Sequence, residues 1–335
     1  MTAPNLLPEQ AARAERLLEP IGEKLQLVEE ELKRNFQSRI RTVQDVGDHI
    51  LAGGGKRLRP ALLLIASKLL RYEGKRDVTY GAVVEFIHNA TLVHDDIIDE
   101  AEVRRGRTSI NYRWGNNLTV LVGDYIFMNS MSMALGDGSL EILRLLSNVT
   151  LRMIEGEILG LEHSGRADLT IEDYFEIVHR KTAVLFGACC RIPAIIAEAG
   201  EAAADALQDY GVNLGICFQL IDDLLDFTSS TEILGKPALS DLKEGKVTLP
   251  LILAMPRATP REQEIITHVA ARKSFDDVDP AEIGAIVRKY DALDETRAIA
   301  RDYAARARAA LGPFPASAAR EALEAALDFV LERDR

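Results

Sequence analysis

The sequence has little cysteine, no long apolar run and no segment typical of a linker. Only three of its 335 residues are cysteines: Cys189, Cys190 and Cys217. Their spacing fits no metal site and adjacent cysteines rarely pair, so we expect small core residues in a reducing cytoplasm. Apolar stretches stay below the roughly 18 residues that span a bilayer, and the first residues contain no apolar signal segment. We therefore expect neither a membrane span nor a signal peptide.

Positive net charge is also lacking, because 52 acidic residues outnumber 40 basic ones and leave a formal net charge of −12. This balance excludes nucleic-acid binding as a property of the whole surface. The basic residues that stand out form two short clusters: Lys56, Arg57 and Arg59, then Arg104, Arg105 and Arg107. Local basic clusters in an acidic protein indicate a small anionic ligand, although two solvated turns would have the same composition.

Strict alternation of apolar and polar residues is scarce, whereas apolar residues recur at spacings of three and four. This pattern, with abundant Ala, Leu, Glu and Arg, predicts an all-α fold. The expected helices cover residues 8–35, 40–52, 58–73, 78–100, 117–135, 138–163, 170–190, 192–199, 202–230, 246–255, 260–273, 280–290, 293–311 and 316–333. Because no Pro- or Ser-rich linker interrupts them, residues 1–335 are predicted to form one large helical bundle, wrapped by the charged amphipathic helices of 260–335.

Two aspartate clusters of the same pattern each interrupt an apolar stretch. They are Asp95, Asp96 and Asp99, and Asp222, Asp223 and Asp226. The first and last aspartates of a cluster are four residues apart, so on a helix their carboxylates share one face. Carboxylates among apolar neighbours are costly without a counter-charge, and Mg²⁺ removes that cost while leaving coordination positions for substrate phosphate. Two such clusters facing one another would hold a diphosphate between metal ions.

Basic and polar side chains flank the first cluster. The glycines of 53–55 precede Lys56 and Arg59 at a helix start, where free N–H groups and cations favour phosphate. His88 lies two helical turns before the cluster, on the same face. If that helix continues, Arg104 follows the cluster by about a turn and a half. Arginines there would either grip the far oxygens of the diphosphate or only neutralise the carboxylates.

Further candidates surround the second cluster. They are Lys181, Thr182 and Gln219 before it, and Lys236 and Lys246 in the loop after it. Each lysine alone is typical of a solvated charge, but two in one loop beside a carboxylate cluster favour an anion site. Residues 276–279 are also rich in aspartate, yet they precede Pro280 and therefore indicate a loop and a helix cap.

Five segments, taken in order, resemble the trans-isoprenyl diphosphate synthases. They are GGGKRLRP at 53–60, EFIHNATLVHDDIIDEAEVRRG at 85–106, HRKTAVLF at 179–186, FQLIDDLLDF at 218–227 and GKPALSDLKEGK at 235–246. Within that family the chain looks most like the long-chain enzymes that make quinone (ubiquinone) side-chain precursors. The resemblance implies the isoprenoid synthase fold, a helical bundle around a central active-site cavity. It also implies a homodimer that touches a membrane at most peripherally, for product release.

The same resemblance implies a prenyltransferase reaction and roles for individual residues. Isopentenyl diphosphate units would be added to an allylic diphosphate primer with the help of Mg²⁺, with three ions per site in the family. All six clustered aspartates would bind metal, and Asp95, Asp99, Asp222 and Lys181 would be catalytic. Isopentenyl diphosphate would be bound by Lys56, Arg59, His88 and Arg105. The allylic substrate would be bound by Arg104, Lys181, Thr182, Gln219, Lys236 and Lys246.

Product length is predicted from the residues that precede the first cluster. One helical turn, about 5.4 Å, is close to one isoprene unit, so Ala90 and Thr91 would meet the growing tail early. Short-chain relatives place an aromatic plug there, whereas Ala90 leaves the tunnel open. The stop would then lie deeper, at Phe127, Met128 or Met131, unless these side chains only fill the core. As in the long-chain enzymes that the chain resembles, we expect a product of about eight to ten isoprene units.

Four alternatives compete with this interpretation. A shorter-chain farnesyl or geranylgeranyl diphosphate synthase would use the same motifs. A helical di-iron protein is suggested by Glu-x-x-His pairs at Glu85/His88 and Glu176/His179, but it explains neither the aspartate clusters nor the basic loops. A non-catalytic partner subunit should have lost one cluster, and a terpene cyclase would not need the predicted isopentenyl site.

Overall fold

The computed structural model describes residues 18–54, 57–104, 106–228 and 239–333. The chain forms two compact units. Unit 1 comprises Met1–Asn148, Ala188–Gln208 and Pro313–Ala325, and unit 2 comprises Val149–Gly187, Asp209–Gly312 and Ala326–Arg335. Four helices contribute residues to both units: α8 (Leu140–His163), α10 (Val184–Ile196), α11 (Glu201–Thr228) and α18 (Ala318–Leu331).

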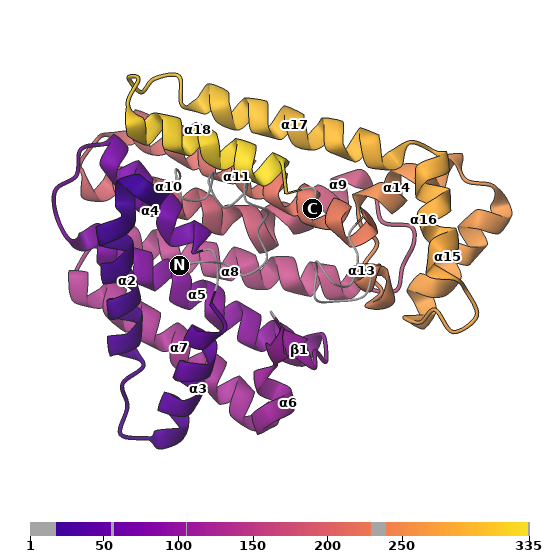
Figure 1. The fold of residues 1–335 in the computed structure, drawn as a ribbon, viewed down its shortest axis with the longest axis horizontal. Coiled ribbons are helices and arrows are strands. Elements are labelled where there is room, and N and C mark those ends of the chain that lie inside the picture. The colour runs from indigo at the N-terminus through magenta and orange to yellow at the C-terminus, as the bar shows by residue number, and fades with distance from the viewer. Residues whose placement is uncertain (1–17, 55–56, 105, 229–238, 334–335) are drawn as a thin grey trace. The chain divides into compact units, whose positions relative to one another are not determined.

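Unit 1 is built around α5 (Figure 1). Its own elements are η1 (Glu19–Ile21), α2 (Gly22–Asn35), α3 (Arg41–Ala52), α4 (Leu58–Leu69), α5 (Arg76–Ile98), β1 (Val103–Arg104), β2 (Arg107–Thr108), α6 (Ile110–Trp114) and α7 (Asn116–Asp137). Helix α5 packs against α2, α4, α6 and α7. Most of its residues before the aspartate cluster are buried, so the cluster stands at the end of a core helix.

Unit 2 contains the second aspartate cluster on the C-terminal part of α11. The other elements are α9 (Ile171–Val178), the π-helix η2 (His179–Ala183), α13 (Ser240–Lys243), α14 (Leu249–Ala254), η3 (Met255–Arg257), α15 (Pro260–Arg272), α16 (Pro280–Lys289) and α17 (Ala292–Ala310). Helix α14 is buried throughout, and it packs against α9, α16 and α17. Asp279 caps α16 by accepting from Ala281 N–H at 2.8 Å, as expected for the aspartates of 276–279.

The helices follow the expected pattern with several differences, and residues 8–17 and 229–230 of the expected helices lie outside the described residues. A two-stranded antiparallel hairpin, pairing Val103 with Thr108 and Arg104 with Arg107, lies between the expected helices 78–100 and 117–135. Helix α10 runs unbroken across residue 191, where one expected helix ended and the next began, and continues through Pro193. The expected helix 170–190 contains a π-turn at 179–183. All three cysteines are buried and free, and burial raises their thiol pKa values, to about 12 at Cys189 and Cys217, as suits inert core residues.

Helix α7 combines a core face with an apolar face that stays open. Among the described residues it is the one helix long and apolar enough to cross a membrane, although a third of its most apolar window is buried. A Cβ at Gly123 would lie 2.2 Å from His94 Nε2, so α5 and α7 approach closely there. Its opposite face exposes Leu121, Met128 and Leu135, each above 60%. In the single chain Met128 therefore points outward, whereas Phe127 and Met131 are half-buried.

Candidate active site

The first aspartate cluster lies where α5 ends. The N–H of Asp99 donates to the carbonyl of Asp95 at 2.8 Å, and Glu100 follows in the left-handed conformation with φ +49°. A left-handed residue ends helical hydrogen bonding. The helix therefore ends close to the expected residue 100 and does not continue to Arg104, because the chain reverses into the β1–β2 hairpin.

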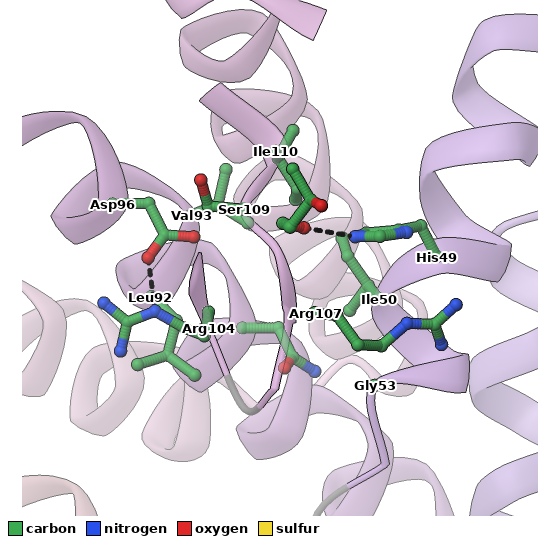
Figure 2. Close-up of a pocket in the computed structure, with 12 residues that line it drawn as sticks. His49, Ile50, Gly53, Leu92, Val93, Asp96, Arg104, Arg107, Ser109 and Ile110 are labelled. Atoms are coloured by element: carbon green, nitrogen blue, oxygen red, sulfur yellow. Dashed lines mark hydrogen bonds and ion pairs between the residues drawn. The ribbon is translucent and has the colours of Figure 1, made fainter. Parts of the chain in front are cut away.

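The hairpin nevertheless brings Arg104 back to the cluster. Its Nε donates to Asp96 Oδ1 (Figure 2). Asp96 is buried, and Asn111 Nδ2 donates to its carbonyl at 3.0 Å. Asp95 and Asp99 are half-buried, so these two carboxylates keep surface that a ligand can reach while Asp96 holds the arginine.

A hollow of about 470 Å³, part of it open to solvent, borders the Asp96–Arg104 pair (Figure 2). It is lined by His49, Ile50, Gly53, Asn89, Leu92, Val93, Asp96, Arg104, Arg107, Thr108, Ser109 and Ile110. His49 Nε2 donates to the Thr108 carbonyl at 2.8 Å and so ties α3 to the hairpin. Asn89 Nδ2 is buried and has no hydrogen-bond partner among the described residues. An unsatisfied buried donor is costly, so Asn89 marks a place for a ligand or water oxygen that sequence reasoning missed.

Arg57 does not belong to the anion site in which the sequence placed it. Its guanidinium donates from Nε to Glu29 Oε1 at 2.6 Å and from Nη1 to Glu85 Oε1 at 2.7 Å. Burial lowers its pKa, but the two glutamates outweigh burial and raise that pKa further above its usual value. Arg57 is 4% exposed, so its charge is used inside the core and cannot meet a phosphate.

The two Glu-x-x-His pairs likewise serve other purposes. Glu85 neutralises Arg57, and Glu176 accepts from Arg180 Nε at 2.5 Å. Burial lowers the pKa of His179. The glutamates of both Glu-x-x-His pairs are thus engaged by arginines.

Two further candidates in unit 1 are Arg59, in the first turn of α4, and His88, on α5 before the aspartate cluster. Arg59 and His88 are both half-buried. The Arg59 charge acts on the buried Cys189 thiol and lowers its pKa, against the larger effect of burial. Lys56 and Arg105 lie outside the described residues, as does Lys236 of unit 2.

In unit 2, the three aspartates of the second cluster differ sharply in accessibility. Asp223 and Asp226 are each 2% exposed, whereas 34% of the Asp222 side chain is exposed. Asp226 Oδ1 accepts from Ser240 Oγ at 2.8 Å, and its Oδ2 accepts from Asp241 N–H at 3.2 Å. Asp226 thus fixes the start of α13, and Asp222 is the carboxylate of this cluster that a metal ion can reach.

Asp222 has one further neighbour at the C-terminal end of the described chain. Arg333 Nη1 lies 2.9 Å from Asp222 Oδ1, an ion pair without hydrogen-bond alignment. The Arg333 guanidinium also covers the ring of Phe218 at 4.6 Å. Sequence reasoning missed this contact because 111 residues separate its two members.

Lys181 and Thr182 lie in the π-turn between α9 and α10. Lys181 pairs with Glu157 of α8, and Thr182 Oγ1 donates to Gln219 Oε1 at 3.0 Å. A Cβ at Gly156 would lie 2.6 Å from the Lys181 backbone nitrogen, so the turn packs on α8 only because a glycine stands there. Lys246 donates to Glu244 Oε2 at 2.7 Å.

The electrostatics of Asp223 follow from its burial. Burial, then the charges of Asp241 and Asp222, raise its pKa to about 8, against hydrogen bonds from Tyr174 and Gln219 that lower it. A carboxyl with this pKa tends to be protonated when nothing cationic is bound nearby. A divalent cation at the neighbouring Asp222 would oppose that tendency.

The donor set fits Mg²⁺ bound together with a diphosphate. Asp95, Asp99 and Asp222 are the half-buried carboxylates of the two clusters. Mg²⁺ usually takes one or two protein carboxylates and completes its shell with water and substrate phosphate. A few accessible carboxylates on apolar helices suit this partial coordination by protein. A structural metal ion would instead need most of its ligands from the protein.

Comparison with known proteins identifies the family of this chain. A family model described as polyprenyl synthetase matches residues 40–286. Octaprenyl diphosphate synthase of Escherichia coli K12 is 39% identical over 301 residues, 90% of this chain and 93% of the relative. This chain therefore belongs to the polyprenyl synthetase family, and it is a prenyltransferase with the all-helical fold of that family.

Solved structures give the same result for the fold. A polyprenyl synthase from Caulobacter crescentus, complexed with calcium and isoprenyl diphosphate, superposes with a TM-score of 0.92 at 38% identity, covering 96% of this chain and 98% of that one. A decaprenyl diphosphate synthase from Rhodobacter capsulatus has a TM-score of 0.91 at 36% identity, covering 96% and 99%. The predicted all-α isoprenoid synthase fold is confirmed.

Proposed function

We propose that this enzyme adds isopentenyl diphosphate units to an allylic diphosphate and makes a long-chain all-trans polyprenyl diphosphate for quinone side chains. The observation that carries the proposal is the pattern of accessible carboxylates, Asp95, Asp99 and Asp222, at positions of two otherwise apolar helices. Similarity to octaprenyl and decaprenyl diphosphate synthases supports the long product. Both aspartate clusters are proposed to bind metal and diphosphate.

Magnesium is the proposed cofactor, with three ions as in the family. Asp95 and Asp99 would hold ions from one cluster and Asp222 from the other. When bound, these ions would neutralise charge on the diphosphate that leaves the allylic carbon. The buried Asp96, Asp223 and Asp226 would support the site from behind, because their oxygens are already engaged by Arg104, Tyr174 and Ser240.

The protein side chains bind, orient and exclude water. Arg104, Lys181 and Thr182 would hold the allylic diphosphate, so that charge develops next to fixed cations as the C–O bond breaks. Arg59 and His88 would place isopentenyl diphosphate with its double bond facing the allylic cation. The new C–C bond forms, and the proton lost passes to the released diphosphate. No side-chain nucleophile takes part, and apolar walls keep water from quenching the cation.

The length of the product is set, in this proposal, by an apolar tunnel beside α5. Ala90 is buried and small, Thr91 is half-buried, and Phe127 and Met131 on α7 are half-buried. Helices α5 and α7 pack together along their length. The small residues near the cluster let the tail pass, and the larger ones further along would stop it at about eight to ten units.

A homodimer in the cytoplasm is the proposed working form. The support is the exposed face of α7, where Leu121, Tyr125, Met128 and Leu135 recur at helical spacing. Exposed apolar faces of this kind mark interaction sites. Sedimentation of the purified protein tests the dimer, and a monomer that is active at assay concentration would contradict it.

The function is tested by incubating the protein with Mg²⁺, farnesyl diphosphate and isopentenyl diphosphate and sizing the products. Asp95→Ala and Asp222→Ala should each reduce turnover at least about a hundredfold, because several kcal/mol of charge stabilisation is lost. Asp276→Ala is the matched control, since that aspartate is exposed in a loop and its loss should leave turnover unchanged. Near wild-type turnover in Asp222→Ala would refute the assignment.

A further inference from the structure

A buried hydrogen-bond network stands behind the second aspartate cluster in unit 2. The Tyr174 hydroxyl of α9 donates to Asp223 Oδ2, and Gln219 Nε2 donates to Asp223 Oδ1 at 2.8 Å. Tyr174 is 4% exposed and Asp223 is 2% exposed. Both carboxylate oxygens are thus occupied by protein donors inside the core, whereas the side chain of the neighbouring Asp222 is 34% exposed.

The same network reaches the turn that carries the predicted allylic-site residues. Gln219 uses its amide nitrogen on Asp223 and its amide oxygen to accept from Thr182 Oγ1 at 3.0 Å. Thr182 follows Lys181 in the π-turn, a backbone irregularity that is frequent at functional sites. Four side chains, Tyr174, Asp223, Gln219 and Thr182, therefore form one continuous chain from α9 through α11 to the turn.

A hydrogen-bonded chain of this kind fixes rotamers. Asp222 and Asp223 are adjacent on α11, so holding the buried carboxylate also fixes the helix segment from which Asp222 projects. At the other end, Thr182 is tied to the same segment, and Lys181 moves with it. Groups behind a metal site that orient the groups facing it commonly change affinity or activity by about 10- to 100-fold when removed.

We propose that Tyr174 is a positioning residue of the allylic half-site: through Asp223 and Gln219 its hydroxyl sets Asp222 against the Lys181–Thr182 turn. Asp223 is then the anchor of this network and not a direct metal ligand, which departs from the role its motif suggests. The proposal rests on the proposed function for the identity of the ligand. It assigns Tyr174, outside both aspartate motifs, a specific effect on the allylic substrate.

The test compares Tyr174→Phe with a matched control, Tyr290→Phe. Tyr290 also lies in unit 2 and also donates its hydroxyl to a carboxylate, Glu262 Oε2 at 2.8 Å, but it has no part in the network. Calorimetry with Mg²⁺ and farnesyl thiodiphosphate, an unreactive allylic analogue, measures binding without turnover. Steady-state kinetics then give separate KM values for farnesyl and isopentenyl diphosphate.

We expect Tyr174→Phe to bind the thiodiphosphate about 10- to 100-fold more weakly. Its KM for farnesyl diphosphate should rise, while its KM for isopentenyl diphosphate and its melting temperature stay close to those of Tyr290→Phe. In an Asp223→Asn background the Tyr174→Phe change should weaken thiodiphosphate binding much less, because the hydroxyl has lost its carboxyl acceptor.

Three results would overturn the proposal. They are unchanged thiodiphosphate binding in Tyr174→Phe, an equal rise of both KM values together with a lower melting temperature, and the same binding loss with or without Asp223. If the wild-type protein bound the analogue but made no polyprenyl product, the proposed function would fail. The binding comparison would still decide the role of Tyr174.

Discussion

Removing the buried charge of Arg57 should destabilise unit 1 strongly, although Arg57 is not one of the residues proposed to bind substrate or metal. The Arg57 side chain is 2% exposed, and its partners Glu85 and Glu29 are 3% and 22% exposed. In Arg57→Met, Glu85 is left as a buried charge without a partner, whereas Glu29 recovers some hydration. Truncating one member of a buried ion pair lowers the free energy of unfolding by about 3–5 kcal/mol. Because Glu29 has access to water, we expect a loss at the lower end, about 3 kcal/mol.

Urea unfolding followed by far-UV circular dichroism measures that loss. With a slope of about 2–3 kcal/mol/M, the midpoint of Arg57→Met should fall by about 1–1.5 M. Arg34→Met is the matched control: Arg34 pairs with Glu31 at 2.6 Å, but its side chain is 67% exposed. An exposed pair of this kind should cost less than about 0.5 kcal/mol.

A double variant separates the charge from the packing. Arg57→Met with Glu85→Met should recover at least half of the loss, because exchanging a buried ion pair for apolar side chains is often close to neutral. Arg57 has φ +46°, and methionine keeps a Cβ, so backbone strain at that position is similar in both variants. A loss below about 1 kcal/mol in the single variant, or no recovery in the double variant, would refute this reasoning.

Three further predictions concern metal, pH and product. Arg333→Gln should lower the Mg²⁺ concentration for half-maximal activity by up to about fivefold, because a partly exposed guanidinium no longer competes for Asp222; a higher requirement in a Mg²⁺ titration would contradict this. Hydrogen bonds from Arg76 lower the pKa of Asp137, so Asp137 stabilises the fold above its unfolded pKa, about 3.9, and that contribution disappears as pH falls through the lower folded pKa. Asp137→Asn should therefore lose about 1–2 kcal/mol in urea unfolding at pH 7 and progressively less as the pH falls below the unfolded pKa of about 3.9, and a loss that does not change with pH would be inconsistent with the ion pair. Ala90→Phe should shorten the product, as sized by chromatography, and unchanged length would reject the tunnel.

Local sequence chemistry was sufficient to identify the helices and the carboxylates. Apolar spacing of three and four marks α5, α7 and α11, because a helix that packs in a core must present one apolar face. The i, i+4 aspartates could be placed on one helical face for the same reason. The helix boundaries differed where backbone geometry, and not periodicity, decides: in the π-turn at 179–183 and along α10, which runs past the boundary expected at residue 191.

What each charged side chain does was decided by tertiary contacts. Both aspartate motifs read alike in sequence, yet Asp96, Asp223 and Asp226 are buried against protein donors, and only their neighbours keep surface that a ligand can reach. Arg57 looked like part of a phosphate-binding loop until Glu29 and Glu85 were found around it, 28 residues away on either side. Sequence spacing determines which side chains share a face of one helix, but burial and partners depend on segments far apart in the chain. The carboxylates and basic side chains of this site could therefore be predicted from the sequence. Which of them face a ligand and which support the others could be determined only from the folded structure.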